Sequence, residues 1–251
     1  MHLAVFVVLA QIAIPAPRGY VNDFAGVLDS GSVAHMEAVI AQMRAATRGE
    51  IAVVTLPPAM IGDRAASDMA VQIGRQWGVG AKGEAGDAAK NLGVVVLLVP
   101  LQDHRPGTGQ VFIATGRGAE GFLPDARVGR IRDAMTPYLS GEDYGAGLAV
   151  GVDLIAQAFA DEFGFALTGV EARPPPPEGG SDEFPIPVGW VVAIIILLII
   201  VTRGRILLVP FALGRFGGRG GGRWGGGGGG GGFGGFGGGG GFSGGGAGGR
   251  F

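Results

Sequence analysis

Two carboxylates, those of Glu120 and Asp125, follow a short apolar strand at 111–114 and the glycine-rich turn that ends it. Glycine adopts positive φ angles without steric penalty, so the pattern predicts a turn shaped by Gly116, Gly118 and Gly121. Carboxylates on a loop at the end of a strand are typical of a binding site. A local alternative stays open, because an aspartate directly before a helical pattern is a common N-cap.

The apolar pattern predicts a mixed α/β domain that positions this loop. Helices are expected at 30–48, 63–77, 125–139 and 148–163, and strands at 51–56, 92–99 and 111–114. A helix separates the first two strands, so they should run parallel, whereas a hairpin should turn the third antiparallel to the second. The expected fold is a small mixed sheet layered with helices.

This topology predicts which residues share one edge of the sheet. The start of the second strand (Asn91), the end of the third (115–116) and the start of the first (Glu50) should lie together. Glu120 and Asp125 should therefore lie near Asp87 and Asn91, and not near Pro57 and Pro58. Clustered oxygen ligands of this kind suit a hard cation such as calcium or magnesium.

Composition narrows the class of function. The chain has 251 residues and no cysteine, which excludes disulfides, thiolate metal sites and a cysteine nucleophile. All six charged residues after Thr202 are arginines, which leaves 13 basic and 21 acidic residues before that point, a net charge of −8. An acidic domain is an unlikely partner for nucleic acid, and we therefore exclude nucleic-acid binding as its function.

The composition also divides the chain. We assign a signal-peptide-like segment (1–17), the domain (18–168), a proline-rich linker (169–183), a transmembrane helix (184–202) and an Arg/Gly-rich tail (203–251). Residues 184–202 carry no charge and approach the roughly 20 residues that cross a bilayer. Arginines follow this segment and acids precede it, which predicts a single-pass cell-membrane protein with an extracytoplasmic domain and a cytoplasmic tail. For the apolar run at 3–14 the alternative is a buried first strand.

The tail is mostly glycine, with 26 glycines among the last 38 residues. Such a segment buries too little apolar surface to fold, so we predict that it is disordered. Its scattered aromatic residues leave two interpretations open, a solvated tail or weak contacts with a partner or lipid headgroups.

An ordered set of motifs resembles the TPM-domain family, specifically its bacterial membrane-anchored type with a glycine-rich tail. The motifs are YVNDFAGVL (20–28), EIAVVT (50–55), WGVG (77–80), NLGVVVLL (91–98), TGRGAEGFLPDA (115–126) and GEDYG (141–145). The resemblance implies an α/β fold with a central sheet sandwiched by helices on the extracytoplasmic side. Family members include a thylakoid-lumen protein with reported acid phosphatase activity and an auxiliary protein of an acetylcholine receptor.

The resemblance also implies a metal site. Some relatives bind calcium or magnesium near the equivalents of Asp23, Glu120 and Asp125. For Asp23 an alternative stays open, in which its carboxylate caps a turn. This chain departs from the family in one place, because many relatives carry Asp-Asn-Gly where it has Asn91-Leu92-Gly93. The loss of one carboxylate lowers the ligand charge that a cation would meet there.

Two functions remain as hypotheses. The first is a metal-assisted phosphatase, in which a calcium or magnesium ion polarises a phosphate ester while Arg117 or Arg127 contacts the phosphate. The sequence holds no phosphatase nucleophile motif, so enzyme activity is an open question. The second, which we favour, is a binding, assembly or maintenance module for an unidentified membrane-protein partner, in which a cation only holds the loop in shape.

Overall fold

Two aliphatic runs form the centre of a five-stranded sheet in the computed structural model, which describes residues 14–84, 87, 89–169 and 235–251. β2 (Glu50–Thr55) and β3 (Gly93–Val99) run parallel and are buried along their whole length, because helices cover both faces. β1 (Val21–Asp23) pairs with β2 in parallel, and β4 (Gln110–Gly116) pairs antiparallel with β3. The order β1-β2-β3-β4-β5 confirms the predicted mixed sheet.

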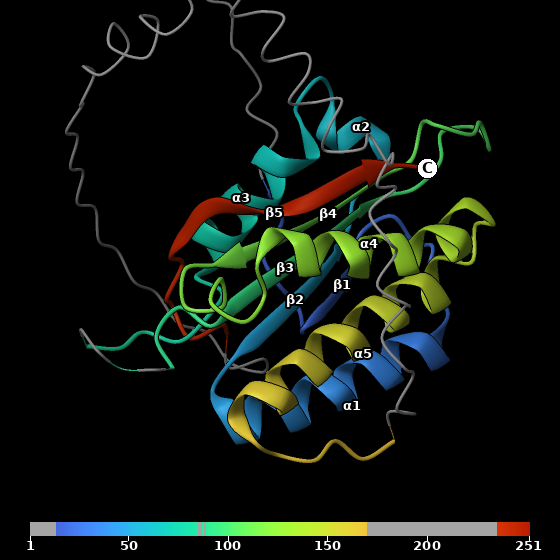
Figure 1. Ribbon diagram of the computed structural model, residues 1–251. Coiled ribbons are helices and arrows are strands. Elements are labelled where there is room, and N and C mark those ends of the chain that lie inside the picture. The colour runs from blue at the N-terminus through green and yellow to red at the C-terminus, as the bar shows by residue number, and fades with distance from the viewer. Residues whose placement is uncertain (1–13, 85–86, 88, 170–234) are drawn as a thin grey trace, which may run out of the picture. The chain divides into compact units, whose positions relative to one another are not determined.

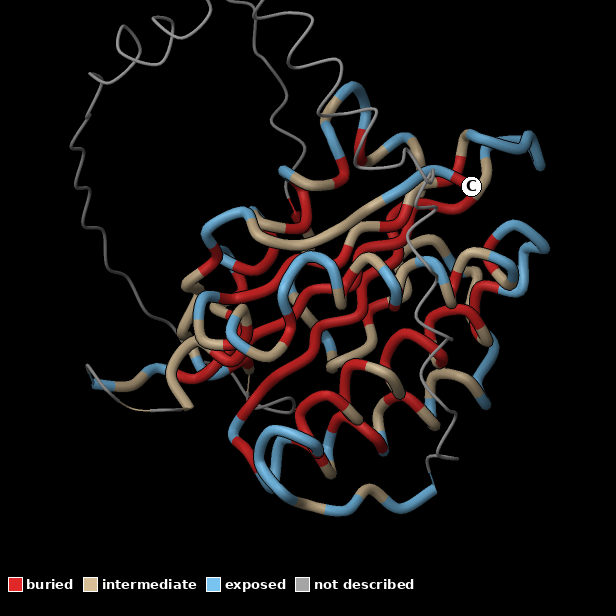
Figure 2. The backbone as a smooth tube through the Cα atoms, in the orientation of Figure 1, coloured by how far each residue is buried: buried red, intermediate tan, exposed pale blue. Residues whose placement is uncertain are grey.

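Helices form a layer on each face of the sheet (Figure 1). One face packs against α1 (Ser30–Thr47), α4 (Asp125–Ser140) and α5 (Tyr144–Phe163). The other packs against α2 (Pro58–Ile61) and α3 (Ala66–Trp77). Figure 2 shows the buried residues gathered along the sheet and the inner faces of these helices. The α/β sandwich is thus as predicted, although β1 and α2 are short elements that the sequence pattern did not indicate.

Local sequence sets several helix ends. α1 begins after Asp29, whose carboxylate accepts a hydrogen bond from the Ser32 N–H at 2.9 Å. A further hydrogen bond from the Ser32 hydroxyl lowers the pKa of Asp29. α3 and α5 end at Gly78 and Gly164, both with φ of 69°, a conformation that favours glycine.

The last strand, β5 (Phe242–Arg250), comes from the glycine-rich tail and pairs antiparallel with β4. The prediction of a disordered tail is therefore wrong for residues 235–251, which we call the C-terminal segment. That prediction was based on the glycine residues, which have no apolar side chain to bury. Burial instead comes from three widely spaced rings, those of Phe236, Phe242 and Phe251, which are 9%, 2% and 8% exposed.

Several predicted segments lie outside the described residues. They are most of the signal-peptide-like segment, all of the linker except Gly169, the transmembrane prediction at 184–202 and the tail up to residue 234. Within the described ranges, no helix is both long and apolar enough to cross a bilayer. The end of the first segment does contact the domain, because the Trp77 indole donates to the Pro15 carbonyl at 3.0 Å.

Candidate functional site

The outer edge of β4 holds a strand that is distant in sequence. The ladder runs from Gln110, opposite Arg250, to Gly116, opposite Phe242, with an irregularity between Ala114 and Gly116. Without β5, these backbone groups of β4 would form an open sheet edge, which is a template for another strand. We call this edge and the side chains that hold the C-terminal segment the acceptor edge.

An aromatic pocket holds the start of the C-terminal segment. The Phe236 ring stacks on Trp77, with centroids 5.9 Å apart and planes inclined by 10°. Its second contact is an edge-on approach to Tyr20 at 6.1 Å. Burial raises the pKa of the Tyr20 hydroxyl, as expected for a ring enclosed by such neighbours. Stacked and edge-on rings stabilise beyond their buried area, so Phe236 is an anchor for the segment.

Two further rings complete the set of anchors. Phe242 enters the core beneath α3, where its ring lies against Gly74. Phe251 enters the opposite core near Gly109 and Tyr144, with its ring 6.4 Å from the tyrosine ring. The C-terminal segment is therefore fixed on both faces of the sheet as well as along the β4 backbone.

The glycines between these rings permit close contact. A Cβ atom at Gly239 would lie 2.6 Å from the Gly80 carbonyl oxygen, and one at Gly248 would lie 2.3 Å from the Phe112 ring. Both distances are far below van der Waals contact, so these positions accept glycine only. The glycine content that indicates disorder in the sequence here allows the segment to lie flat on the domain.

A buried carboxylate binds the backbone of the same segment. Glu50 is 1% exposed, and its two oxygens accept the Gly237 N–H at 2.9 and 2.8 Å. The carboxylate also accepts the Gly80 N–H at 2.8 Å and the Arg44 Nε–H at 3.2 Å. A buried charge needs several such partners, and the C-terminal segment supplies one of them.

Two arginines bind carbonyl groups of β5. Arg75 on α3 donates from Nε and Nη2 to the Phe242 carbonyl oxygen at 3.1 and 2.7 Å. Arg132 on α4 donates from Nη1 to the Gly248 carbonyl oxygen at 2.8 Å. Hydrogen bonds from charged donors are stronger than neutral ones, so both helices help to hold the strand.

The two carboxylates of the predicted loop also face β5. The Ser243 hydroxyl donates to Glu120 Oε1, and the Gly246 N–H donates to Asp125 Oδ1 at 2.8 Å. Asp125 is the first residue of α4, and the N-cap position belongs to Pro124, so the N-cap alternative is wrong. A carboxylate in the first turn is still favourable because of the helix dipole.

One buried hydroxyl beside this loop has no partner. Thr115 is fully buried, and its Oγ1 makes no hydrogen bond to any described residue. A Cβ atom at Gly245 would lie 3.3 Å from this oxygen and 3.1 Å from Glu120 Oε1, so both oxygens face the same point. An unpaired buried polar group is costly, which makes this point a candidate for a polar ligand.

The third predicted ligand lies at the other end of the sheet. Asp23 is opposite Thr55, at the carboxyl end of β2, whereas Thr115 is opposite Val94, at the amino end of β3. The three carboxylates expected to form one metal site are therefore separated, because β1 runs parallel to β2 and β4 runs antiparallel to β3. In the part of the chain that the structure describes, no three His, Cys, Asp or Glu residues cluster as a metal site.

Asp23 instead closes a turn. Its carboxylate accepts the N–H groups of Gly26, Val27 and Leu28 at 2.9, 3.2 and 3.0 Å, and it also accepts the Thr55 hydroxyl. This is the commoner of the two roles that the sequence allowed.

The candidate phosphate contacts and loop glycines have different environments. Arg117 is exposed, whereas Arg127 donates to the Asp161 carboxylate at 3.1 Å. Of the loop glycines Gly116, Gly118 and Gly121, none has a positive φ. The prediction that they shape the turn by adopting positive φ angles is therefore wrong. Gly116 and Gly118 are required by proximity, because their Cβ atoms would lie 2.5 Å from the Asn91 oxygen and 2.1 Å from the Lys90 oxygen; Gly121 has open space.

The predicted shared edge is confirmed. Glu50 lies opposite Gly93, Thr115 lies opposite Val94, and the Gly118 N–H donates to the Asn91 carbonyl at 3.2 Å. The same edge carries Glu120. Asn91 has φ of 57°, which asparagine tolerates better than most residues.

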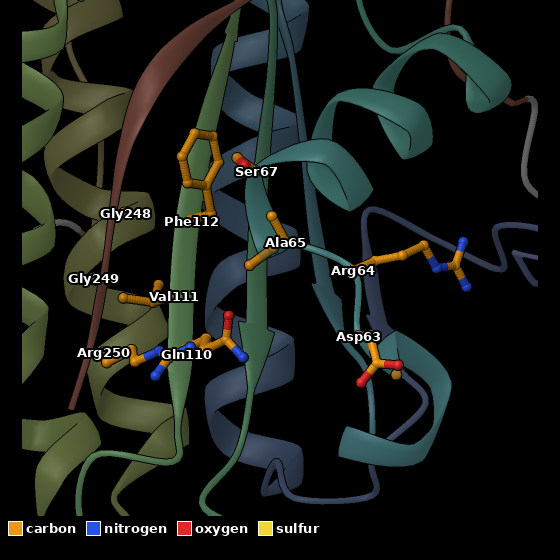
Figure 3. A pocket seen from close by; sticks show the side chains of 12 residues that line it. Asp63, Arg64, Ala65, Ser67, Gln110, Val111, Phe112, Gly248, Gly249 and Arg250 are labelled. Atoms are coloured by element: carbon orange, nitrogen blue, oxygen red, sulfur yellow. The ribbon is translucent and has the colours of Figure 1, made fainter.

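A pocket lies at the other end of the β4–β5 pair (Figure 3). It is a hollow of about 640 Å³ between the α2–α3 turn and the two strands, and Gly248, Gly249 and Arg250 form one of its walls. Figure 3 shows Arg64 pointing away from β4, while Ser67 and Phe112 both line the pocket. The C-terminal segment thus completes this pocket as well as the sheet.

Sequence reasoning missed the residues that hold the segment. They are Glu50 as a ligand of backbone N–H groups, Arg75, Arg132, and the rings of Phe236, Phe242 and Phe251. The one available signal was the aromatic residues at intervals in the tail, because isolated rings in a glycine background can act as anchors.

The fold and the site define a three-layered α/β domain whose sheet edge is completed by a distant strand. The chain belongs to the TPM domain family, whose model matches residues 21–158, from β1 into α5. The C-terminal segment lies outside that match.

The solved structures that are similar to this chain include the N-terminal domain of a protein from P. gingivalis, determined by solution NMR. It shares 34% identity with this chain, and the alignment covers 58% of this chain and 84% of that chain with a TM-score of 0.47. Comparison with curated proteins gave no match.

Proposed function

We propose that this chain is a membrane-attached binding module that captures an extended polypeptide segment along the acceptor edge. The observation that carries the proposal is the pairing of β5 with β4. The C-terminal segment that supplies β5 begins at residue 235, which is 77 positions after the matched family range ends at residue 158, so this pairing is made entirely by residues distant in sequence. Its partner in a cell would be a membrane protein or an assembly of membrane proteins that presents such a segment.

The pairing of β5 with β4 is made by the same kinds of interaction that other domains use to bind peptides. Main-chain hydrogen bonds along β4 supply affinity for any extended segment, and ring pockets supply selectivity, as in other sites that add a strand to a sheet edge. The loop carboxylates expected as metal ligands, Glu120 and Asp125, instead accept hydrogen bonds from Ser243 and Gly246 of the added strand. The two carboxylates of this edge are thus arranged to bind an added polypeptide strand, one through a side-chain hydroxyl and one through a backbone N–H.

The experiment measures binding of a labelled peptide of residues 235–251 to the full chain. The receptor is the triple variant Phe236→Ala/Phe242→Ala/Phe251→Ala, whose own segment lacks its three anchors while the acceptor edge is unchanged. We expect saturable binding to this variant by fluorescence anisotropy. Binding to the wild type should be at least about 100-fold weaker, because a tethered segment competes at an effective concentration near the millimolar range.

The matched control is the same peptide with its three phenylalanines replaced by alanine, which keeps the backbone donors and removes the rings. It should not bind measurably. If the intact peptide fails to bind the triple variant while circular dichroism shows that variant to be folded, the proposed function is wrong.

A second candidate function is the metal-assisted phosphatase, and the unpaired Thr115 hydroxyl favours it. Thr115 Oγ1 and Glu120 Oε1 face one point, and both are oxygen ligands of the kind that calcium and magnesium prefer. Asp125, the first residue of α4, adds a carboxylate shortly after this loop. In this proposal Asp23 is not a ligand, because it lies at the opposite end of the sheet. Arg117, which is exposed, is the better placed of the two arginines for contact with a phosphate.

The cation is tested by thermal unfolding of the full chain with and without millimolar calcium or magnesium. If a cation binds the folded state, the melting temperature should rise, with about 2.7 kcal/mol of stabilisation at a concentration 100 times Kd. Glu120→Gln should abolish the rise, and the exposed control Glu162→Gln should keep it. An unchanged melting temperature with both ions would argue against this candidate, and phosphate-ester hydrolysis need be assayed only where a shift occurs.

A further inference from the structure

Each copy of this chain carries both halves of a strand-pairing site. The acceptor edge belongs to the body of the domain, and the C-terminal segment supplies the strand and the three rings that fill it. Every contact between these halves involves groups that a second copy also has. The contacts therefore do not depend on whether the segment and the edge belong to the same molecule.

The connection between the two halves is long. Sixty-five residues separate Gly169 from Gly235, and at roughly 3.3 Å per residue they span up to about 210 Å. This length neither forces the segment onto its own domain nor prevents it from reaching a neighbouring one.

Charge favours the same pairing between copies. The first 202 residues carry a net charge of −8, whereas the six charged residues that follow are all arginines, including Arg250 in β5. Opposite charges steer encounters between the tail of one copy and the domain of another. Like-charged domains alone would repel.

We infer that the C-terminal segment of one copy docks on the acceptor edge of a second copy, so that copies of this chain join by strand exchange. The inference rests on the proposed function and names its partner, which is a second copy of the same chain. Reciprocal exchange gives a closed twofold dimer, whereas one-way exchange gives an open chain of copies.

Competition within one molecule sets the concentration at which exchange occurs. The tethered segment acts at an effective concentration near the millimolar range, so dilute wild-type chains should remain monomeric. Exchange becomes competitive where copies are crowded to similar local concentrations, and it becomes dominant when pairing within one molecule is blocked.

Two complementary full-length variants isolate the exchange. The acceptor variant is the triple alanine variant described above, which keeps its edge and loses its rings. The donor variant is Gly74→Leu, which keeps its rings and fills the Phe242 pocket, because even a Cβ atom at this position would lie 2.5 Å from the Phe242 ring. Gly109→Leu is a second donor variant, since its Cβ would lie 2.4 Å from the Phe251 ring.

The mixture is measured in detergent by light scattering coupled to size-exclusion chromatography. Each variant alone should be monomeric, and the acceptor with either donor should form a 1:1 complex with a Kd within about tenfold of that of the peptide of residues 235–251. An excess of that peptide should dissociate the complex.

The outcomes separate the inference from the function on which it rests. If the peptide binds the acceptor variant but neither donor variant forms a complex with it, exchange is overturned and the binding function stands. If the peptide does not bind the acceptor variant, the proposed function is wrong, and the inference that rests on it falls with it. A complex that forms equally well with a donor variant that also carries Phe242→Ala would show association by another surface and would likewise overturn the inference.

Discussion

Replacing Phe242 by alanine is expected to release β5 and to lower the free energy of unfolding by about 3 kcal/mol, the lower end for a buried phenylalanine. The ring is 2% exposed and packs in the core beneath α3. The loss is limited to the docking energy of the strand, because the rest of the domain keeps its own core. Urea unfolding of the full chain gives the change in stability, and hydrogen exchange of the β4 amides reports whether the edge has opened.

Gly74 provides an internal check on this explanation. In an isolated helix, alanine in place of glycine stabilises by about 1 kcal/mol. Here three ring atoms of Phe242 lie 2.5–2.7 Å from the position of the new Cβ, and overpacking of this kind costs about 1–3 kcal/mol. We therefore expect Gly74→Ala to destabilise the wild type and to stabilise the Phe242→Ala variant.

The control is Phe163→Ala, since the Phe163 ring is 37% exposed and its removal should leave the β4 amides protected. If Gly74→Ala stabilises the wild type, or if β4 exchange is unchanged in Phe242→Ala, then β5 does not hold the edge in solution.

Cysteine substitutions on the domain and on the C-terminal segment are expected to react from the same side of a membrane. A single crossing at 184–202, with an outside domain and a cytoplasmic tail, would put β4 and β5 of one molecule on opposite sides. The ladder between these strands requires both on one side. The pairing and the single-pass topology therefore cannot hold for the same molecule.

The chain contains no cysteine, so single substitutions give clean labels. Ser140→Cys reports the domain and Ser243→Cys reports β5, and both positions are exposed. A membrane-impermeant maleimide added to intact cells and to inverted vesicles should label both variants in the same preparation. Labelling after detergent treatment controls for reactivity. Labelling in opposite preparations would support the single-pass prediction and would mean that β5 does not pair with its own domain in the membrane.

The sequence by itself determined the centre of the fold. β2 and β3 are aliphatic runs, and the helices around them have apolar positions at regular spacing, so their local patterns were sufficient. The order of these elements in the chain then places Glu50, Asn91 and Thr115 at one edge of the sheet, whatever contacts their side chains make. Such predictions succeed because periodicity and chain connectivity are properties of neighbouring residues.

The sequence predicted the residues of the candidate site only in part. Glu120 and Asp125 do lie at the expected edge, but their partners are Ser243 and Gly246, more than 100 residues away. Asp23 was grouped with them by family resemblance, whereas strand direction carries it to the other end of the sheet. The direction of the three-residue β1 has no sufficient local signal.

Only the tertiary structure decided the role of the glycine-rich segment. Glycine has no side chain and hence no periodicity, so composition cannot distinguish a segment without structure from one that must lie flat against another backbone. The difference lies in what that segment meets: an open β4 edge, the buried carboxylate of Glu50, and pockets for three rings. These are contacts between distant residues, and they exist only once the rest of the chain has folded.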